Sequence, residues 1–178
     1  ALQIVKEKQS TDGTDINVLR IPNNSKTEDR FRIAKEYVDT YNPDWLSLQY
    51  VPYSFHPKGL PFGLAKHLSD MAKGRKWHIM FHELWVGITR LSTWKHKIIG
   101  QLQQSIAKAL MNKLLPSEIT TSNRLYQLLL ESIDIKATIL PLFSNIARIK
   151  LDLKLLQGRS PLHFDLNNLP NYHTIGLF

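Results

Sequence analysis

"KWHIMFHELWVG", at residues 76–87, opens with an apolar run and ends that run on a histidine followed by a glutamate. A short apolar run of this length, rich in β-branched and aromatic residues, predicts a buried strand over residues 77–82. In an open parallel sheet, ligands bind outside the carboxyl ends of the strands. His82 and Glu83 are therefore the first candidate catalytic residues. The alternative for His82 is a capped, hydrogen-bonded core residue.

The sequence on both sides of this stretch alternates between strand and helix patterns. Further strands are predicted by short apolar runs at 16–21, 46–51, 118–121 and 136–140. A helix is predicted before Asn42-Pro43, with Ser25 and Glu28 as a capping box. A second helix is predicted over 94–115, with one apolar face formed by Ile98, Leu102, Ile106, Leu110 and Leu114. This alternation predicts an α/β fold, a three-layer sandwich whose mostly parallel sheet has helices on both faces.

Four of the predicted strands end next to polar or aromatic residues, and these ends should meet in one crevice. Tyr53 follows the strand at 46–51, and Trp85 follows His82 closely. Aromatic rings at such positions can stack on a sugar, although aromatic residues more often belong to the core. Gly59 and Gly63 precede a helical stretch. They fit either a tight turn with close packing or a helix N-terminus open to an anion.

Composition limits the class of protein. The chain has 178 residues, enough for one domain, and its formal net charge is +8. It contains no cysteine, which fits a reducing compartment. The sequence has no apolar run long enough for a membrane span and no signal-peptide pattern at its start, so we expect a soluble, cytoplasmic protein. Its basic residues are dispersed rather than clustered, which makes nucleic acid the weaker choice among anionic partners.

Several common motifs are missing. A zinc protease motif would need a second histidine four residues after His82, where the chain has Val86. The glycines at 59 and 63 do not form a dinucleotide or Walker loop. The chain also lacks the serine elbow of α/β-hydrolases. A nucleotide-sugar epimerase or dehydrogenase would need a glycine fingerprint after its first strand, and the chain shows none. No residue pattern implies a metal.

Four stretches together carry a resemblance to a known family. They are "NPDWLSLQYVPYSFHPKGLP", "WHIMFHELWVG", "EITTSNRLYQLLL" and "ILPLFSNI". In order and spacing they resemble the N-terminal domain of GT-B glycosyltransferases, most of all the retaining group that builds bacterial polysaccharides and glycolipids. The resemblance implies that residues 1–148 form part of a Rossmann-like, acceptor-side domain. It also implies that residues 149–178 are a linker and the first strand of a C-terminal donor domain.

The resemblance further implies roles for individual residues. His82 would lie near the donor sugar and its leaving pyrophosphate, while Glu83 would either orient the imidazole or act as a charge at a helix N-terminus. The other residues of the acceptor and donor cleft would be Tyr53, Gly59, Trp85, Ser122, Asn123 and Asn145. The implied substrates are a nucleotide sugar and a glycan or lipid-linked acceptor, with no cofactor besides the nucleotide sugar and no nucleic acid.

The activity of the chain alone, its contact with a membrane and an alternative function are the subject of further expectations. Relative to the family, the chain starts after the first strand and ends before the donor domain, so the chain alone is expected to be an inactive fragment. A peripheral contact with an anionic membrane is predicted from Lys95, His96 and Lys97, which stand beside Trp94. The alternative function, from a different class, is a non-enzymatic α/β module that binds phosphorylated ligands.

Overall fold

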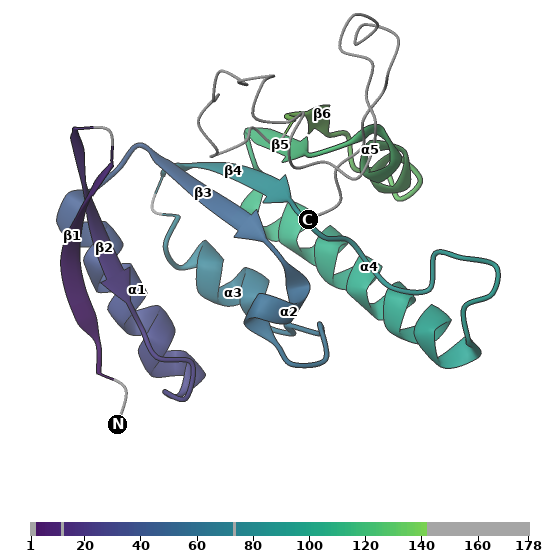
Figure 1. Ribbon diagram of the computed structural model, residues 1–178, viewed down its shortest axis with the longest axis horizontal. Coiled ribbons are helices and arrows are strands. Elements are labelled where there is room, and N and C mark those ends of the chain that lie inside the picture. The colour runs from purple at the N-terminus through teal and green to yellow at the C-terminus, as the bar shows by residue number, and fades with distance from the viewer. Residues whose placement is uncertain (1–2, 12, 73, 142–178) are drawn as a thin grey trace, which may run out of the picture. The chain divides into compact units, whose positions relative to one another are not determined.

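The computed structural model describes residues 3–11, 13–72 and 74–141. The chain divides into two units, 1–142 and 143–178, and only the first contains described residues. Asn145 and the predicted boundary after residue 148 therefore lie outside the described residues, and both stay predictions. Figure 1 shows the arrangement of the elements.

The described part is an α/β unit with a parallel sheet of four strands, and this part of the fold prediction is confirmed. The strands are β3 (Trp45–Tyr50), β4 (Lys76–Phe81), β5 (Glu118–Thr121) and β6 (Thr138–Ile139). They lie in the order β3-β4-β5-β6, and each neighbouring pair is parallel. Each new strand is added on the same side of the one before it. Crossovers of the same hand then all pass over the same face of the sheet.

The partner predicted for the first strand is wrong. Residues 16–21 were expected to join the parallel sheet, but β2 (Thr14–Arg20) pairs antiparallel with β1 (Val5–Thr11) in a separate two-stranded sheet. The reason is local, because two strands joined by a tight turn pair as a hairpin, and Gly13 adopts the positive φ of 77° that such turns require. The prediction for 16–21 had the right conformation and the wrong partner.

Helix α1 (Thr27–Tyr41) follows the hairpin and ends where Asn42-Pro43 predicts, with Asn42 in the left-handed region. The predicted capping box is wrong, because the helix begins after Lys26 and no side chain caps it. The N–H of Ser25 instead donates to the Pro22 carbonyl in the preceding turn. At the other end, Arg75 donates to Asp39 and Asn42, which fastens the end of α1 to the segment before β4.

The remaining helices are α2 (Pro52–Phe55), α3 (Leu64–Ser69), α4 (Trp94–Leu114) and α5 (Arg124–Glu131). One core cluster joins α3, α4 and α5 to one face of the sheet, with members that include Leu68, Leu110 and Leu130. Along β3 the alternate residues Leu48 and Tyr50 enter this cluster. Among the described residues, the second layer of helices that a three-layer sandwich requires is not seen, so that finer prediction stays a prediction.

The apolar face predicted for α4 is only half correct. Ile106, Leu110 and Leu114 are buried, whereas Ile98 and Leu102 are exposed. Residues four apart on an α-helix are rotated by about 40° at each step, because a turn takes 3.6 residues. The row from Ile98 to Leu114 therefore winds around the helix, and its first two members leave the core. Gln103 occupies the core side of the helix there.

Candidate functional site

The carboxyl ends of the four parallel strands meet at one edge of the sheet. In register, the final residues of the strands lie side by side: Tyr50, Phe81, Thr121 and Ile139. His82 follows β4 directly, and its main-chain N–H donates to the Tyr50 carbonyl over 3.1 Å. Ser122 follows β5 in the same way. The sheet therefore brings His82 and Ser122 to the same edge, on neighbouring strands.

The imidazole of His82 is half-buried and is held by Gln49. Its Nε2 atom lies 2.6 Å from the Gln49 Oε1 atom. An amide oxygen only accepts hydrogen bonds, so Nε2 carries the proton and donates it. No hydrogen bond to Nδ1 is found among the described residues. The imidazole is thus fixed at one nitrogen.

Gln49 is itself part of a row of side chains that crosses three strands. Its amide donates to the Ser47 Oγ atom over 2.9 Å. The Ser47 hydroxyl lies 2.9 Å from Nδ1 of His78, whose Nε2 lies 2.8 Å from the Thr120 hydroxyl. We call this row, made of His82, Gln49, Ser47, His78 and Thr120, the polar ladder. Its members alternate along each strand with residues that face the core cluster, so the ladder lies on the opposite face of the sheet.

The described residues show neither of the two roles predicted for Glu83, and its part in catalysis stays a prediction. The imidazole of His82 is oriented by Gln49 and not by Glu83. The next helix, α4, begins only at Trp94, so Glu83 is not a charge in the first turn of a helix. The carboxylate is exposed, and it forms no ion pair within the part of the chain that the structure describes. It stands next to His82 with its charge directed to solvent.

Gly59 and Tyr53 pack against each other beside α4. Gly59 has a φ of 64°, and a Cβ atom added there would lie 3.0 Å from the Tyr53 ring and 2.5 Å from the Gln103 amide nitrogen. The turn and close-packing interpretation of Gly59 is therefore what the structure shows. The ring of Tyr53 remains about half exposed next to it. A part for either residue in a cleft stays a prediction.

Trp85 belongs to the core cluster, which is the alternative that the sequence left open for it. Its buried ring is not presented for stacking on a sugar. It does line a hollow of about 320 Å³, which is also bordered by Val86 and Gly87 of the same loop, by Gly100 and Gln104 of α4, and by Leu129 of α5. Trp85 therefore forms part of the wall of this hollow and does not offer an open aromatic face.

Ser122 and Asn123 form the start of α5. The Asn123 Oδ1 atom accepts a hydrogen bond from the Tyr126 N–H over 2.9 Å, and its amide nitrogen donates to the Ser122 Oγ atom over 3.1 Å. Asn123 is thus the N-cap of the helix, which accounts for its residue type. Ser122 is half-buried at the edge and is the first residue after β5.

Gln103 is a buried polar residue that the sequence analysis did not identify. Only 2% of it is exposed, and both ends of its amide are used. Its Oε1 atom accepts from the Val86 N–H over 2.9 Å, and its Nε2 atom donates to the Gly59 carbonyl over 3.1 Å. It therefore ties the loops after β3 and β4 to α4. The backbone of α4 and the loop after β4 approach each other closely at Gly100, where an added Cβ atom would clash with the Val86 carbonyl oxygen.

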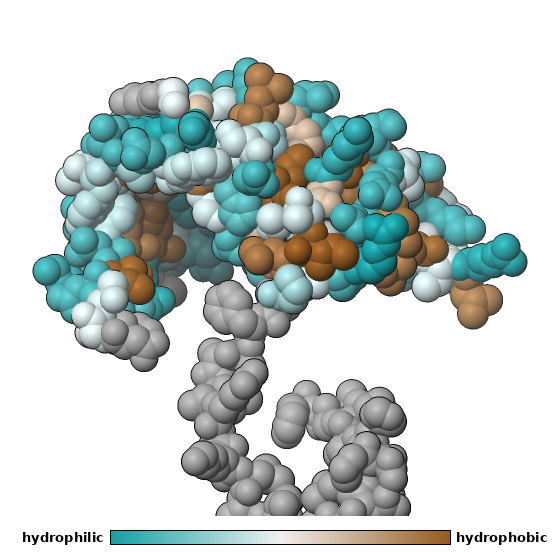
Figure 2. Space-filling view, turned by 90° about the horizontal axis from the view of Figure 1, so that it is seen from above, coloured by the Kyte–Doolittle hydropathy of each residue, from teal (hydrophilic) through white to brown (hydrophobic). Residues whose placement is uncertain are grey.

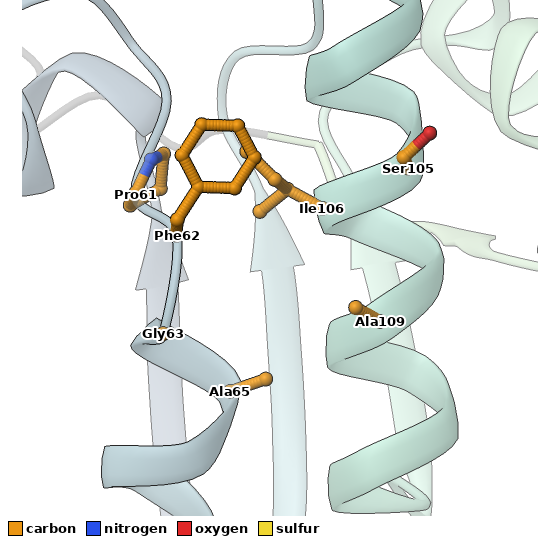
Figure 3. Close-up of a pocket in the computed structure, with 7 residues that line it drawn as sticks. All are labelled: Pro61, Phe62, Gly63, Ala65, Ser105, Ile106 and Ala109. Atoms are coloured by element: carbon orange, nitrogen blue, oxygen red, sulfur yellow. The ribbon is translucent and has the colours of Figure 1, made fainter.

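A second hollow, of about 230 Å³, lies between α4 and the segment that leads into α3. Figure 3 shows the Phe62 ring lying over it toward Ile106, with Ala65 and Ala109 facing it from the two helices. Ser105 is the one lining residue with a polar side chain. A catalytic site needs several convergent polar groups, so this apolar hollow is not the candidate active site.

The polar ladder could have been found from the sequence by its period. Ser47 and Gln49 alternate with Leu46, Leu48 and Tyr50, and a two-residue alternation is typical of a strand with one polar face. His82 follows the last residue of β4 and stands four residues after His78, so an extended chain places both on the same face of the sheet. Gln103 has no such signal, because its position in an apolar helix face depends on how α4 packs.

Burial raises the pKa of Tyr50, whose hydroxyl finds no hydrogen-bond partner among the described residues. Within the same residues, no group of side chains could hold a metal ion, and no helix is long and apolar enough to cross a membrane. No family model, curated protein or solved structure matches the chain.

Proposed function

We propose that this chain forms the acceptor side of a glycosyltransferase, which transfers a sugar from a nucleotide-sugar donor to a glycan or lipid-linked acceptor. The observation that carries the proposal is the edge where His82 and Ser122 follow neighbouring parallel strands. His82 is fixed there by Gln49. The strand-end rule for ligand sites in parallel sheets and the resemblance of the four sequence stretches support the same assignment.

The proposed chemistry follows from the imidazole. Sugar transfer with departure of a nucleoside diphosphate develops negative charge on the leaving phosphate, and a preorganised donor at that point lowers the barrier. Since Nε2 is already engaged, protonated His82 would donate to the phosphate through Nδ1. Gln49 is then a positioning residue, which holds the ring in place. The Ser122 hydroxyl, one strand away, is the second polar group that would face the substrate.

The finer points of the architecture belong to the same proposal. The polar ladder would lie inside a three-layer, Rossmann-like domain of the GT-B type once another layer covers that face of the sheet. The nucleotide would be held mainly by a donor domain, and the reaction would need no metal and no further cofactor. A cytoplasmic location is part of the proposal as well.

The test uses the protein translated from its complete reading frame. It is incubated with a panel of nucleotide sugars and with glycan and lipid acceptors, and release of nucleoside diphosphate is measured. The proposal expects one donor to give acceptor-dependent release. Tight binding of a phosphorylated ligand with no turnover on any donor would instead favour the non-enzymatic module.

The residue test compares His82→Ala with His78→Ala. Both side chains belong to the polar ladder, but only His82 stands at the carboxyl edge. We expect His82→Ala to lower turnover by roughly 100-fold or more, the size of effect seen when a preorganised donor is lost, with little change in melting temperature. His78→Ala should leave the turnover of the folded enzyme nearly unchanged. Equal losses in both variants would contradict the role of His82.

A further inference from the structure

Helix α4 has a second apolar side that does not face the core. Trp94, Ile98 and Leu102 follow one another at four-residue steps, which places them along one side of the helix. Leu91, in the loop three residues before Trp94, is a further exposed apolar residue. Their exposed fractions are 97% for Leu91, 67% for Trp94, 48% for Ile98 and 39% for Leu102. We call these four residues the α4 ridge.

A further exposed apolar side chain lies on the segment that leads into α3. Phe62 is largely exposed and lies over the hollow that Ile106 and Ala109 line further along α4 (Figure 3). The loop before α4 lies at the right of Figure 1. At the right-hand end of Figure 2, hydrophobic and hydrophilic side chains stand directly next to one another. Large exposed apolar side chains that gather beside polar groups are typical of interaction sites.

The charges around the ridge are all of one sign along the chain. Between Glu83 and Glu118 the sequence has no acidic residue and five basic ones, which are Arg90, Lys95, Lys97, Lys108 and Lys113. Lys95 places its amino group 5.8 Å from the centre of the Trp94 ring. Within the described residues, Arg90, Lys95 and Lys97 form no ion pair. The first half of the segment therefore presents free positive charge beside exposed apolar side chains.

We propose that the α4 ridge docks on a membrane surface that contains anionic lipids. Leucine, isoleucine and tryptophan would enter the boundary between headgroups and acyl chains, where a tryptophan ring is favoured by its apolar body and polar N–H. Arg90, Lys95 and Lys97 would reach the headgroup phosphates, since long basic side chains can extend along an apolar surface to a charged layer. The proposal does not rest on the glycosyltransferase assignment.

A lipid surface fits better than the other anionic partners. Nucleic acid would pair with the basic residues but would leave Leu91 and Ile98 without an apolar environment. A second copy of the chain would bring its own basic residues against those of the first, which is unfavourable at an interface. A surface that is both apolar and negatively charged complements the ridge together with the basic residues beside it.

The test is sedimentation of the protein with vesicles, either of phosphatidylcholine alone or with one third phosphatidylglycerol, at low and at high salt. We expect binding to the anionic vesicles only, and binding that weakens as salt rises. Lys95→Gln/Lys97→Gln should lower the affinity for anionic vesicles at least about 10-fold. Lys6→Gln/Lys8→Gln, in the hairpin, removes the same charge from another element and should change the affinity much less.

A second set of variants tests the contribution of the apolar side chains to membrane binding. Trp94→Gln/Ile98→Gln should abolish binding to anionic vesicles, whereas Leu115→Gln, at an even more exposed leucine at the far end of α4, should not. Brominated lipids should quench tryptophan fluorescence in the wild type, and Trp94→Phe should remove most of that quenching. The proposal is overturned by equal binding to neutral and anionic vesicles, or by equal losses in the control variants. Self-association of the protein that the ridge variants abolish would overturn it in favour of a second copy.

Discussion

Tyr50 carries a hydroxyl group inside the core. Its ring packs edge-on against Phe81, with the ring centres 5.2 Å apart, and it stacks with Phe55 of α2. The hydroxyl is buried without a partner among the described residues. A buried polar group without a hydrogen bond lowers stability, and burial also opposes its ionisation.

The prediction at this scale is that Tyr50→Phe is neutral or stabilising by about 1 kcal/mol in urea unfolding near neutral pH. The raised pKa of Tyr50 adds a pH dependence. The unfolded tyrosine ionises above pH ~10 while the folded one keeps its proton, so the stability of the wild type falls as pH rises through that range, by up to about 1.4 kcal/mol per pH unit.

Tyr50→Phe should lose less stability than the wild type over the same pH interval. Tyr53→Phe, at an exposed tyrosine in α2, is the matched control and should follow the wild type. If Tyr50→Phe lowered stability by more than about 1 kcal/mol, the hydroxyl would have to make a hydrogen bond in solution.

At the scale of elements, α4 holds the loops that reach the candidate site. Gln103 bonds to the loop after β3 at Gly59 and to the loop after β4 at Val86. Removing this amide would leave an N–H and a carbonyl group without partners in a buried place, and each such group costs about 1–3 kcal/mol.

We therefore expect Gln103→Leu to lower the free energy of unfolding by about 2–4 kcal/mol, as measured by urea denaturation. Gln101→Leu makes the same substitution at an exposed glutamine two positions before Gln103. Its free energy of unfolding should stay within about 0.5 kcal/mol of the wild-type value. A Gln103→Leu protein as stable as the wild type would show that the loops are held by other contacts.

The same helix shows what the sequence can and cannot predict about an element. Its bounds follow from the sequence, because the apolar pattern begins at Trp94 and ends near Leu115. The side that packs does not follow, since a row of residues spaced by four winds around the helix and only the packed half stays in the core. The burial of Gln103 and the exposure of Leu102 depend on where the loops after β3 and β4 lie, which no local pattern contains.

At the scale of the whole molecule, the parallel strands could be predicted and the hairpin partner could not. Apolar runs at 46–51, 77–82 and 118–121 predict strands that the structure contains, and their common sheet follows from the helices between them. The hairpin pairs through Gly13, and its residues are mostly exposed, so hydrophobic burial gives no signal there. The edge with His82 and Ser122 followed from topology, while the polar ladder needed the register of three strands.

The separation of the hairpin from the parallel sheet predicts that the two parts differ in local stability. A two-stranded hairpin is marginally stable by itself, whereas β4 is flanked by β3 and β5 and contributes Ile79 and Phe81 to the core. In hydrogen-exchange mass spectrometry, amides of β4 should exchange at least about 100-fold more slowly than those of β1 and β2. Equal protection of the hairpin and of β4 would mean that the hairpin is packed as firmly as the sheet.

The polar ladder also decides where a proton can travel. A hydroxyl group can accept a proton from one neighbour and donate its own proton to another. The Ser47 hydroxyl could therefore transfer a proton to or from His78. The amide of Gln49 cannot do so, because its oxygen only accepts and its nitrogen only donates. Gln49 therefore prevents proton transfer between His82 and the other members of the polar ladder. Among the described residues, proton transfer along the ladder therefore ends at Gln49 and does not reach His82.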